Sequence, residues 1–407
     1  MDRRVVITGI GAVSPIGGNA SEMWASCRGG ICGIKPISEQ TIEDIPISLA
    51  GEVANHVLEE NLEKRDIRFA SRATSFARIA AKEAWKDSGL SKEGVDTDRI
   101  GVMISSSIGG GDVLDKGISK DQIGPFFIPG SAIHSPSAMV ALDLDVHGIS
   151  MAPVSACAGG ATAIGEAYLR IKSGVEEIMI VGGTDSAINR ATIKGFAAMR
   201  ALYTGEDIER ASIPFDAQRK GFVPGEGAAV LVLESLESAQ KRGAHIYGEV
   251  AGYGYSCDAN HQTAPREDGK YAALAMTNAM KDAGISPKDI TYINAHGTGT
   301  RLNDQAECRA IGEAFGEDYE KPYVSSVKSM TGHMLAASAA LEAVISVKAL
   351  EEGFIPPTIH IESQDEECKI NLVRNEGIKR DIDYVMSNSF GFGGFNSVLI
   401  FSRVRDE

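Results

Sequence analysis

The sequence has no long apolar run. None of its 407 residues falls in a stretch that approaches the about 20 consecutive apolar residues of a membrane-spanning helix. The first apolar run ends at Gly9 and is too short and too rich in β-branched residues for a secretory signal peptide. These absences predict a cytoplasmic protein that does not enter a membrane.

Cysteine motifs that bind zinc or form redox pairs are also missing. The six cysteines are never spaced as C-x-x-C, and no cluster of Cys and His has the spacing of a zinc site. In a chain of this size, scattered cysteines are typical of reduced thiols in the cytosol. We therefore expect no metal ion.

Basic charge is scarce. The chain has 40 Lys and Arg residues against 55 Asp and Glu residues, which gives a net charge of −15. A strongly acidic protein is a poor general binder of nucleic acid. We therefore do not expect nucleic acid to be a partner.

Hydrophobic residues make up 43% of the chain, enough for a large core and for more than one typical domain length. Short apolar runs that read as buried strands alternate with longer helical patterns. The predicted strands are Val5–Ile10, Ile100–Ile104, Ile178–Val181, Ala229–Leu233, Ile290–Asn294, Tyr323–Ser326 and Val398–Phe401. The predicted helices include Ser71–Ser88, Gly159–Lys172, Tyr271–Ala283 and Ala336–Glu351. This alternation predicts an α/β fold with helices on both faces of mainly parallel sheets.

Three distant segments carry the residues that suggest chemistry. Ser155–Gly160 contains Cys157, Asn294–Thr300 contains His296, and Lys328–His333 adds a lysine and a second histidine. Glycine and small residues surround each segment and let the backbone approach a ligand closely. A single buried cysteine is more often a small core residue. With two glycine-framed histidines, however, Cys157 indicates covalent catalysis by a thiol, which imidazole can assist.

Cys157 lies between a predicted strand and the predicted helix that begins at Gly159. This placement aims the thiol at the positive end of the helix dipole. The sequence therefore predicts a lowered pKa for the Cys157 thiol and a larger share of thiolate.

Together with Val5–Gly11 and Asn388–Asn396, these motifs resemble the β-ketoacyl-acyl carrier protein synthases, the elongating condensing enzymes of the thiolase-like superfamily. The resemblance covers nearly the whole chain. It implies a five-layer α-β-α-β-α sandwich of two related halves. Residues 1–250 would hold the nucleophile and a capping insertion at about 108–150, and residues 251–407 would hold both histidines.

The resemblance also implies roles for the site residues. Cys157 would carry the acyl chain, while His296 and His333 would donate hydrogen bonds to the malonyl thioester carbonyl and stabilise the enolate. Lys328 and Glu342 would form a buried ion pair that orients the histidines. Asp304 and Glu307 would support the His296 loop from behind.

Further positions match the pocket of the family. Phe392, framed by Gly391 and Gly393, would gate the pocket and complete an oxyanion hole with its backbone N–H. Ile108 would set the depth of the acyl tunnel, and Phe127 would reach a neighbouring tunnel across a homodimer interface. The matching positions for the phosphopantetheine arm are Thr263, Thr298 and Thr300.

The implied partner is acyl carrier protein, loaded with either the acyl or the malonyl group. It brings the phosphopantetheine itself, so no other cofactor and no metal is expected in the chemistry. Carrier proteins are acidic and this chain is acidic too, so the attraction must be local. Arg68 and Arg72 lie in the densest basic cluster, and Arg200 matches a position at the tunnel mouth. We expect these three to dock the carrier.

Three departures from the family pattern leave the pathway open. They are Phe395 after the gate glycines, Gly148-Ile149-Ser150 before the nucleophile, and Arg301–Asp304 after His296. They allow a ketosynthase of a polyketide or aryl-polyene pathway as an alternative to fatty-acid synthesis. A thiolase acting on coenzyme A esters usually needs a second cysteine near the C-terminus, and none follows Cys368. A catalytically dead chain-length partner usually lacks the nucleophile, so Cys157 argues against it.

Overall fold

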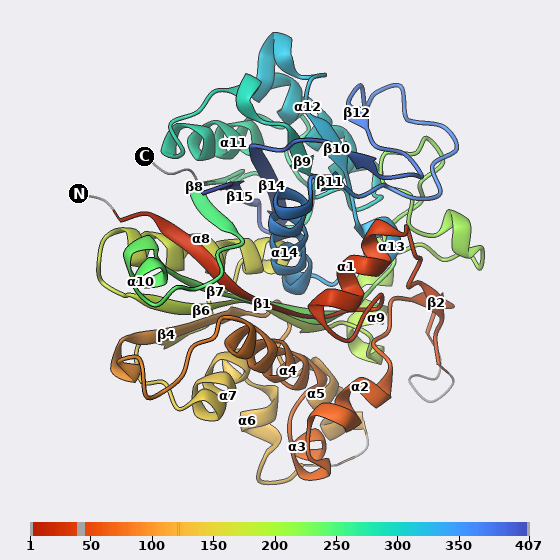
Figure 1. Ribbon diagram of the computed structural model, residues 1–407. Coiled ribbons are helices and arrows are strands. Elements are labelled where there is room, and N and C mark those ends of the chain that lie inside the picture. The colour runs from red at the N-terminus through yellow and green to blue at the C-terminus, as the bar shows by residue number, and fades with distance from the viewer. Residues whose placement is uncertain (1–2, 39–44, 120, 122, 405–407) are drawn as a thin grey trace.

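The computed structural model describes residues 3–38, 45–119, 121 and 123–404. An 11-stranded sheet runs through it in the order β12-β10-β9-β14-β15-β8-β1-β7-β6-β4-β5. Only two residue pairs, Val6 with Glu249 and Ile7 with Gly248, join β1 to β8. The sheet therefore consists of two five-stranded halves that meet at one short pairing, with β12 added at the far edge (Figure 1).

The first half is built from β1 (Val5–Val13), β4 (Ile100–Ser105), β5 (Ser150–Met151), β6 (Ile178–Ser186) and β7 (Glu226–Ser235). In space, the strands follow the order β5-β4-β6-β7-β1. The pairs of β4 with β5 and with β6 are parallel, while β7 is antiparallel to both of its neighbours.

The second half repeats this plan with β8 (Gly248–Cys257), β9 (Tyr292–Asn294), β10 (Tyr323–Ser325), β14 (Tyr384–Gly391) and β15 (Phe395–Ser402). Its order, β10-β9-β14-β15-β8, is the same when each strand is numbered within its own half. The strand directions match as well. The two halves are therefore related, as predicted. A boundary at residue 250 stays a prediction, and β8 crosses that position.

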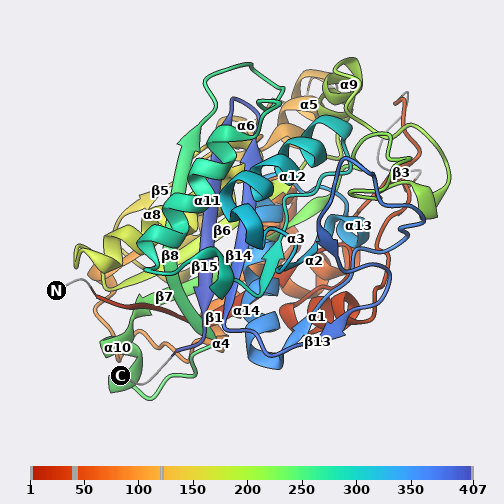
Figure 2. The same ribbon diagram turned by 90° about the horizontal axis from the view of Figure 1, so that it is seen from above.

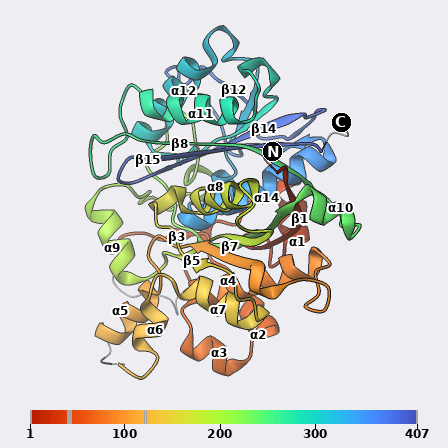
Figure 3. The same ribbon diagram turned by 90° about the vertical axis from the view of Figure 1, so that its left-hand side faces the viewer.

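Helices make three further layers (Figure 3). The middle layer is α8 (Gly159–Lys172) and α14 (Ala336–Glu352), which contact each other and strands of both halves. One outer layer is α4 (Arg72–Asp87) with α7 (Ser135–Leu144), against the first half. The other is α11 (Lys270–Asp282) with α12 (Arg301–Phe315), which lie over β8, β15 and β14 (Figure 2). The five-layer α-β-α-β-α sandwich is confirmed.

The middle layer explains the sequence around it. Nearly every side chain of α14 is buried, as expected for a helix packed between two sheets. Gly160 of α8 lies so close to α14 that an added Cβ would stand 2.5 Å from the Ala336 carbonyl oxygen. Glycine at this position therefore permits the close approach of the two helices that carry the active-site segments.

The remaining elements connect or cap these layers. The helices are α1 (Ala20–Arg28), α2 (Asn55–Asn61), α3 (Lys64–Phe69), α5 (Gly111–Ser119), α6 (Phe127–Ser131), α9 (Arg190–Ala198), α10 (Leu236–Lys241) and α13 (Lys328–Thr331). The strands are β2 (Lys35–Pro36), β3 (Leu49–Ala50), β11 (Phe354–Ile355), β12 (Asn371–Leu372) and β13 (Ile378–Lys379). Within the described ranges, we find no helix with the length and apolar character needed to cross a bilayer.

The seven predicted strands and four predicted helices are all present, with ends that differ by a few residues. The expectation of mainly parallel sheets is wrong, because β1, β7, β8 and β15 run antiparallel to their neighbours. Strands β8 and β14 were not predicted. Glycines at 252 and 254 interrupt the apolar pattern of β8, and they let α11 pack against the strand backbone.

Candidate active site

Cys157 lies in a tight 3₁₀ turn, Ala156–Ala158, directly before α8. Ala156 has a φ of +49°, an unfavourable value for a residue with a side chain, which indicates a strained turn. Gly391 packs against this turn so closely that an added Cβ would lie 2.4 Å from the Ser155 carbonyl oxygen. The turn and the Gly391–Gly394 segment are thus held against each other at the nucleophile.

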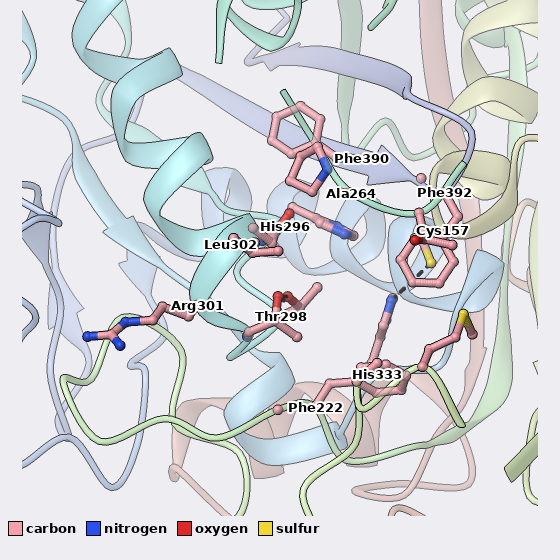
Figure 4. A pocket seen from close by; sticks show the side chains of 18 of the residues that line it. Cys157, Phe222, Ala264, His296, Thr298, Arg301, Leu302, His333, Phe390 and Phe392 are labelled. Atoms are coloured by element: carbon pink, nitrogen blue, oxygen red, sulfur yellow. Dashed lines mark hydrogen bonds between the residues drawn. The ribbon is translucent and has the colours of Figure 1, made fainter. Parts of the chain in front are cut away.

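His333 approaches the thiol directly, with Nε2 3.1 Å from Cys157 Sγ (Figure 4). Its Nδ1 lies 3.2 Å from Ser338 Oγ, and that oxygen also accepts a hydrogen bond from the Met334 N–H. Since the contacts of the described residues give the Ser338 hydroxyl hydrogen no other acceptor, it is best placed on Nδ1. The His333 proton then sits on Nε2, which faces the cavity as a donor.

His296 follows β9 and lies beside His333, with 5.5 Å between the ring centroids. Its backbone is fixed by Glu307, whose carboxylate accepts hydrogen bonds from the N–H groups of His296 (2.9 Å) and Gly297 (2.8 Å). Asp304, which pairs with Arg219 at 3.1 Å, accepts a hydrogen bond from the Gly299 N–H. The structure therefore places both acidic side chains behind the His296 loop.

Both imidazoles are buried, and burial lowers the pKa of His296 and of His333 well below the usual range. The positive charge of Lys328 acts in the same direction on the pKa of each ring. Both histidines are therefore neutral near pH 7. A neutral imidazole can donate a hydrogen bond to a developing oxyanion without first losing a proton.

The Cys157 thiol differs from the prediction. Burial raises its pKa to about 12, although the charge of Lys328 and the backbone N–H groups of Cys157 and Phe392 act to lower it. The predicted lowering of the thiol pKa is therefore wrong, because the effect of burial outweighs the effects of Lys328 and of the two backbone N–H groups. At neutral pH the nucleophile is a thiol that must lose its proton as it attacks.

Lys328 and Glu342 form a buried ion pair next to the histidines. Burial raises the pKa of the Glu342 carboxyl to about 7, and Lys328 acts against this rise. The pair brings the positive charge of Lys328 close to both imidazoles and to the thiol, as their pKa shifts indicate.

Phe392 lies in the turn between β14 and β15, beside Cys157 (Figure 4). Its backbone N–H is near enough to the thiol to affect the pKa of Cys157, so the N–H groups of residues 157 and 392 converge on one point. The ring lies 6.3 Å from that of Phe196. Phe395 covers Gly393, where an added Cβ would come within 2.8 Å of its ring.

A cavity of about 400 Å³ connects these groups to the surface. The threonines at 263, 298 and 300 line it, and the last two join their hydroxyl groups at 2.9 Å. Cys157 lies at one end and Arg301 at the other (Figure 4). Arg200 and Lys220 also line the cavity. The volume is within the range of ligand pockets, and the lining suits an elongated ligand that ends at the thiol.

The comparison with known families agrees with this geometry. The Beta-ketoacyl synthase N-terminal domain family matches residues 2–239, and the Beta-ketoacyl synthase C-terminal domain family matches residues 247–362. The chain belongs to the β-ketoacyl synthase family. The family resemblance predicted from the sequence is thereby confirmed.

Individual relatives match this β-ketoacyl synthase along its whole length. It is 45% identical over 410 residues to 3-oxoacyl-[acyl-carrier-protein] synthase 2 of Staphylococcus aureus (strain N315), covering 99% of each chain. It is 46% identical over 411 residues to the protein of the same name from Coxiella burnetii (strain RSA 493 / Nine Mile phase I), again covering 99% of each. A solved ketosynthase in complex with a type II PKS acyl-carrier protein superposes with a TM-score of 0.92 at 32% identity, covering 100% of both chains.

Not every predicted site residue of this β-ketoacyl synthase lies at the cavity. Ile108 is not among the residues that line it and packs instead against an apolar cluster of Cys157, Ala187 and Leu335. Phe127 of α6 packs against Gly117 of α5, where an added Cβ would lie 2.2 Å from its ring. Its predicted contact across a dimer interface stays a prediction.

The arginines proposed for docking fall into different settings. Arg200 is exposed at the cavity, and Arg68 is exposed on α3. The predicted docking role of Arg72 is wrong. Its guanidinium pairs with buried Glu226 and donates hydrogen bonds to Asn55 and to the Val53 carbonyl. These contacts use the guanidinium within the fold, so Arg72 is not available for docking a carrier.

The sequence prediction missed four residues that shape the site of this β-ketoacyl synthase. They are Asp185, Phe222, Leu335 and Ser338. Phe222 packs edge-on against the His333 ring at a centroid distance of 5.3 Å. Asp185 carried a signal that could have been used, because a polar residue at the carboxyl end of a buried strand often marks a site in α/β proteins.

Proposed function

We propose that this chain is a 3-oxoacyl-[acyl-carrier-protein] synthase, an acyltransferase that elongates an acyl chain by two carbons in fatty-acid biosynthesis. The observation that carries the proposal is the convergence of one thiol, two neutral imidazoles and two backbone N–H groups at the end of one cavity. The 45% identity to 3-oxoacyl-[acyl-carrier-protein] synthase 2 of Staphylococcus aureus supports it.

The first step transfers the acyl group to the enzyme. Cys157 Sγ attacks the carbonyl of the acyl thioester, a new C–S bond forms, and the bond to the phosphopantetheine sulfur breaks. The thiol proton ends on that released sulfur. The N–H groups of Cys157 and Phe392 both lie close to the Cys157 sulfur, so we expect them to donate hydrogen bonds to the oxyanion that forms on the carbonyl bonded to it.

The second step generates the carbon nucleophile. The malonyl group of malonyl-carrier protein enters the cavity, the C–C bond between its methylene and its carboxylate breaks, and carbon dioxide leaves. The electron pair becomes an enolate whose oxygen accepts hydrogen bonds from His296 and His333. The enolate carbon then attacks the acyl-Cys157 carbonyl, and the C–S bond breaks. The product is a 3-oxoacyl chain on the carrier, and the released thiolate takes up a proton.

The partner follows from the shape and charge of the cavity mouth. The arm of an acyl carrier protein is long, narrow and polar, and the threonines at 263, 298 and 300 offer it hydroxyl groups. Exposed Arg200, Lys220 and Arg301 surround the entrance of a chain whose net charge is −15. A local cationic rim suits the acidic carrier by electrostatic complementarity. The solved relative that binds an acyl-carrier protein supports this partner.

A homodimer is the assembly we propose. Strand β5 ends the large sheet and is exposed along its edge, with Met151 39% exposed. Nearby exposed apolar residues include Leu142 and Ile128, both at 71%. Exposed edges and apolar patches of this kind usually pair with another chain. Sedimentation at micromolar concentration should give a dimer, and a fully active monomer would contradict the proposal.

Acylation and turnover test the function together. Incubation with acyl-carrier protein should add one acyl group to Cys157, located by mass spectrometry, and malonyl-carrier protein should then release a chain two carbons longer. Cys157→Ala should abolish both events. Matched Cys308→Ala removes another buried thiol and should leave acylation intact. Acylation of Cys308 or Cys257 instead would overturn the assignment.

The alternative is the same chemistry in a polyketide or aryl-polyene pathway. Phe395, which covers Gly393 at the gate, is the observation that favours it. A panel of acyl-carrier proteins that carry saturated, 3-oxo or aryl-polyene chains separates the two, since only the fatty-acid enzyme should prefer saturated chains.

A further inference from the structure

Asp185 lies at the end of β6, is fully buried, and gathers hydrogen bonds from two separate segments. Its carboxylate accepts hydrogen bonds from the Ser106 hydroxyl (2.7 Å) and from the N–H groups of Ser107 (3.0 Å) and Ile108 (3.2 Å). It also accepts one from the Ala336 N–H (2.8 Å). One side chain thus joins the Ser106–Ile108 loop to the start of α14.

Both segments contribute a side chain to the apolar cluster around the nucleophile. Ile108 comes from the first and Leu335 from the second, and they pack with Cys157 and Ala187 in one cluster. Leu335 has φ +54° and ψ −124°, a conformation that a leucine adopts only when its surroundings hold it there. The hydrogen bond from the next residue, Ala336, to Asp185 is one such constraint.

Asp185 also has an electrostatic effect on the nucleophile. Its negative charge contributes to the raised pKa of Cys157, so the carboxylate lies close enough for the thiol to sense it. Among the described residues, the hydrogen-bond partners of Asp185 are all N–H and O–H donors, and none is a cation. One carboxylate therefore holds the Ser106–Ile108 loop and the start of α14 by hydrogen bonds, and it also acts electrostatically on the Cys157 thiol.

We propose that Asp185 is a positioning residue that sets the acyl chain length the pocket accepts, by holding Ile108 and Leu335 against Cys157. This inference rests on the proposed function for its biological meaning, because the space it limits would hold the acyl chain. If Ile108 or Leu335 were held less firmly, that space could deepen and would favour longer acyl chains. In Asp185→Asn, the side-chain NH₂ group would face some of the N–H donors and could not accept their hydrogen bonds. Ile108 or Leu335 would then be held less firmly.

Alkylating probes measure the depth of the pocket without any condensing activity. Cys157 can be modified with N-butyl and N-dodecyl iodoacetamide, and the ratio of the two rates reports how well a long chain fits. A change in the thiol pKa alters both rates alike and cancels in the ratio. For Asp185→Asn we expect the dodecyl-to-butyl ratio to rise about tenfold, the equivalent of one buried hydrogen bond.

Asp216→Asn is the matched control. Asp216 is also fully buried and accepts N–H hydrogen bonds from Gln218, Glu362 and Ser363, and unlike Asp185 it also pairs with Arg210. In the part of the chain that the structure describes, none of these partners belongs to the Ile108 cluster. Its loss should lower stability and leave the ratio unchanged. Ser106→Ala removes one hydrogen bond to Asp185 and keeps the carboxylate, so it should shift the ratio in the same direction by less, even if Asp185→Asn folds poorly.

The outcomes separate this inference from the proposed function. An unchanged ratio in both Asp185→Asn and Ser106→Ala, or an equal change in Asp216→Asn, would overturn the positioning role. A changed ratio with no elongation of any acyl-carrier protein by the wild type would support the role of Asp185 and reject the proposed function. With both correct, kcat/KM for long over short acyl-carrier proteins should rise in Asp185→Asn as well.

Discussion

Lys328 and Glu342 form an ion pair in which each side chain is only 1% exposed. Removing one charge of a buried pair strongly destabilises the fold, because the other charge is left buried without a partner. The pair also explains why the site keeps a positive charge beside two neutral imidazoles. The pair joins α13 to α14, the helices on either side of His333, and so fixes the charge next to that residue.

Breaking this pair should therefore lower both stability and activity, and different variants should separate the two losses. We expect Glu342→Gln to lower the free energy of unfolding by about 3–5 kcal/mol. The apolar double variant Lys328→Met with Glu342→Leu should recover most of that loss. It should not recover malonyl decarboxylation, because the positive charge near the histidines is gone. Denaturant unfolding and carbon dioxide release measure the two effects.

The exposed pair Lys321–Asp318 is the control, and Asp318→Asn should change stability by less than about 1 kcal/mol. Full activity in the apolar double variant would show that Lys328 serves packing alone.

His296→Ala and His333→Ala should impair decarboxylation more than acyl transfer. Each removes one N–H donor from the enolate, and losing one such donor costs about two to three orders of magnitude in rate. Acylation of Cys157 depends instead on the backbone N–H groups at 157 and 392, so it should fall much less. Exposed His147→Ala is the control. Wild-type decarboxylation by either variant would reject the role.

The pH dependence of Cys157 should reveal its raised pKa. Since that pKa is about 12, the thiolate fraction grows about tenfold for each pH unit across the range from 7 to 10. Alkylation by iodoacetamide should therefore rise steadily over this range without a plateau. A plateau beginning near pH 7 would mean that the helix terminus outweighs burial after all.

The sequence predicts which residues are catalytic better than it predicts the surroundings that set their pKa values. Cys157, His296 and His333 each sit in a glycine-framed segment that follows a strand within a few residues, a local pattern that can be recognised in the sequence. The pKa of Cys157 could not be read in this way. It depends on burial by elements distant in sequence, such as α14 and the Gly391–Gly394 turn, and on the charge of Lys328.

The fold shows the same division. Strands such as β6 and β7 are buried along their length and contain a continuous apolar run, and this run predicts them from the sequence. Strand β14 contains buried Ser387, Asn388 and Ser389, which obscure it in the sequence. Asn388 donates to Glu307 behind the His296 loop. The polar residues that hid the strand are therefore partly those that support the site.

The docking surface provides the last prediction. Arg200 is exposed at the mouth of the cavity, has a φ of +55° and is held by its backbone N–H to the Ala197 carbonyl. Lys220 and Arg301 lie close by, because the Gly221 N–H donates to the Gly299 carbonyl and the Arg219 guanidinium donates to the Arg301 carbonyl. Both Lys220 and Arg301 are exposed. Three cations thus share one rim and can act together on an acidic partner.

Charge reversal of Arg200, alone and with Arg301, should raise KM for acyl-carrier protein by about fivefold per charge, the equivalent of about 1 kcal/mol each. Turnover of short acyl-thioester mimics should stay nearly unchanged, and the effect should shrink at high salt because exposed charges are screened. Charge reversal of Arg68 tests the more distant basic cluster in the same assay.

Arg72→Gln should behave differently, lowering stability without a selective effect on the carrier, since its guanidinium is bound to Glu226. An equal loss with carrier protein and mimic in the Arg200 variants would place these residues in fold stability, and a carrier-selective loss in Arg72→Gln would restore the cluster on α3 and α4 as the docking site.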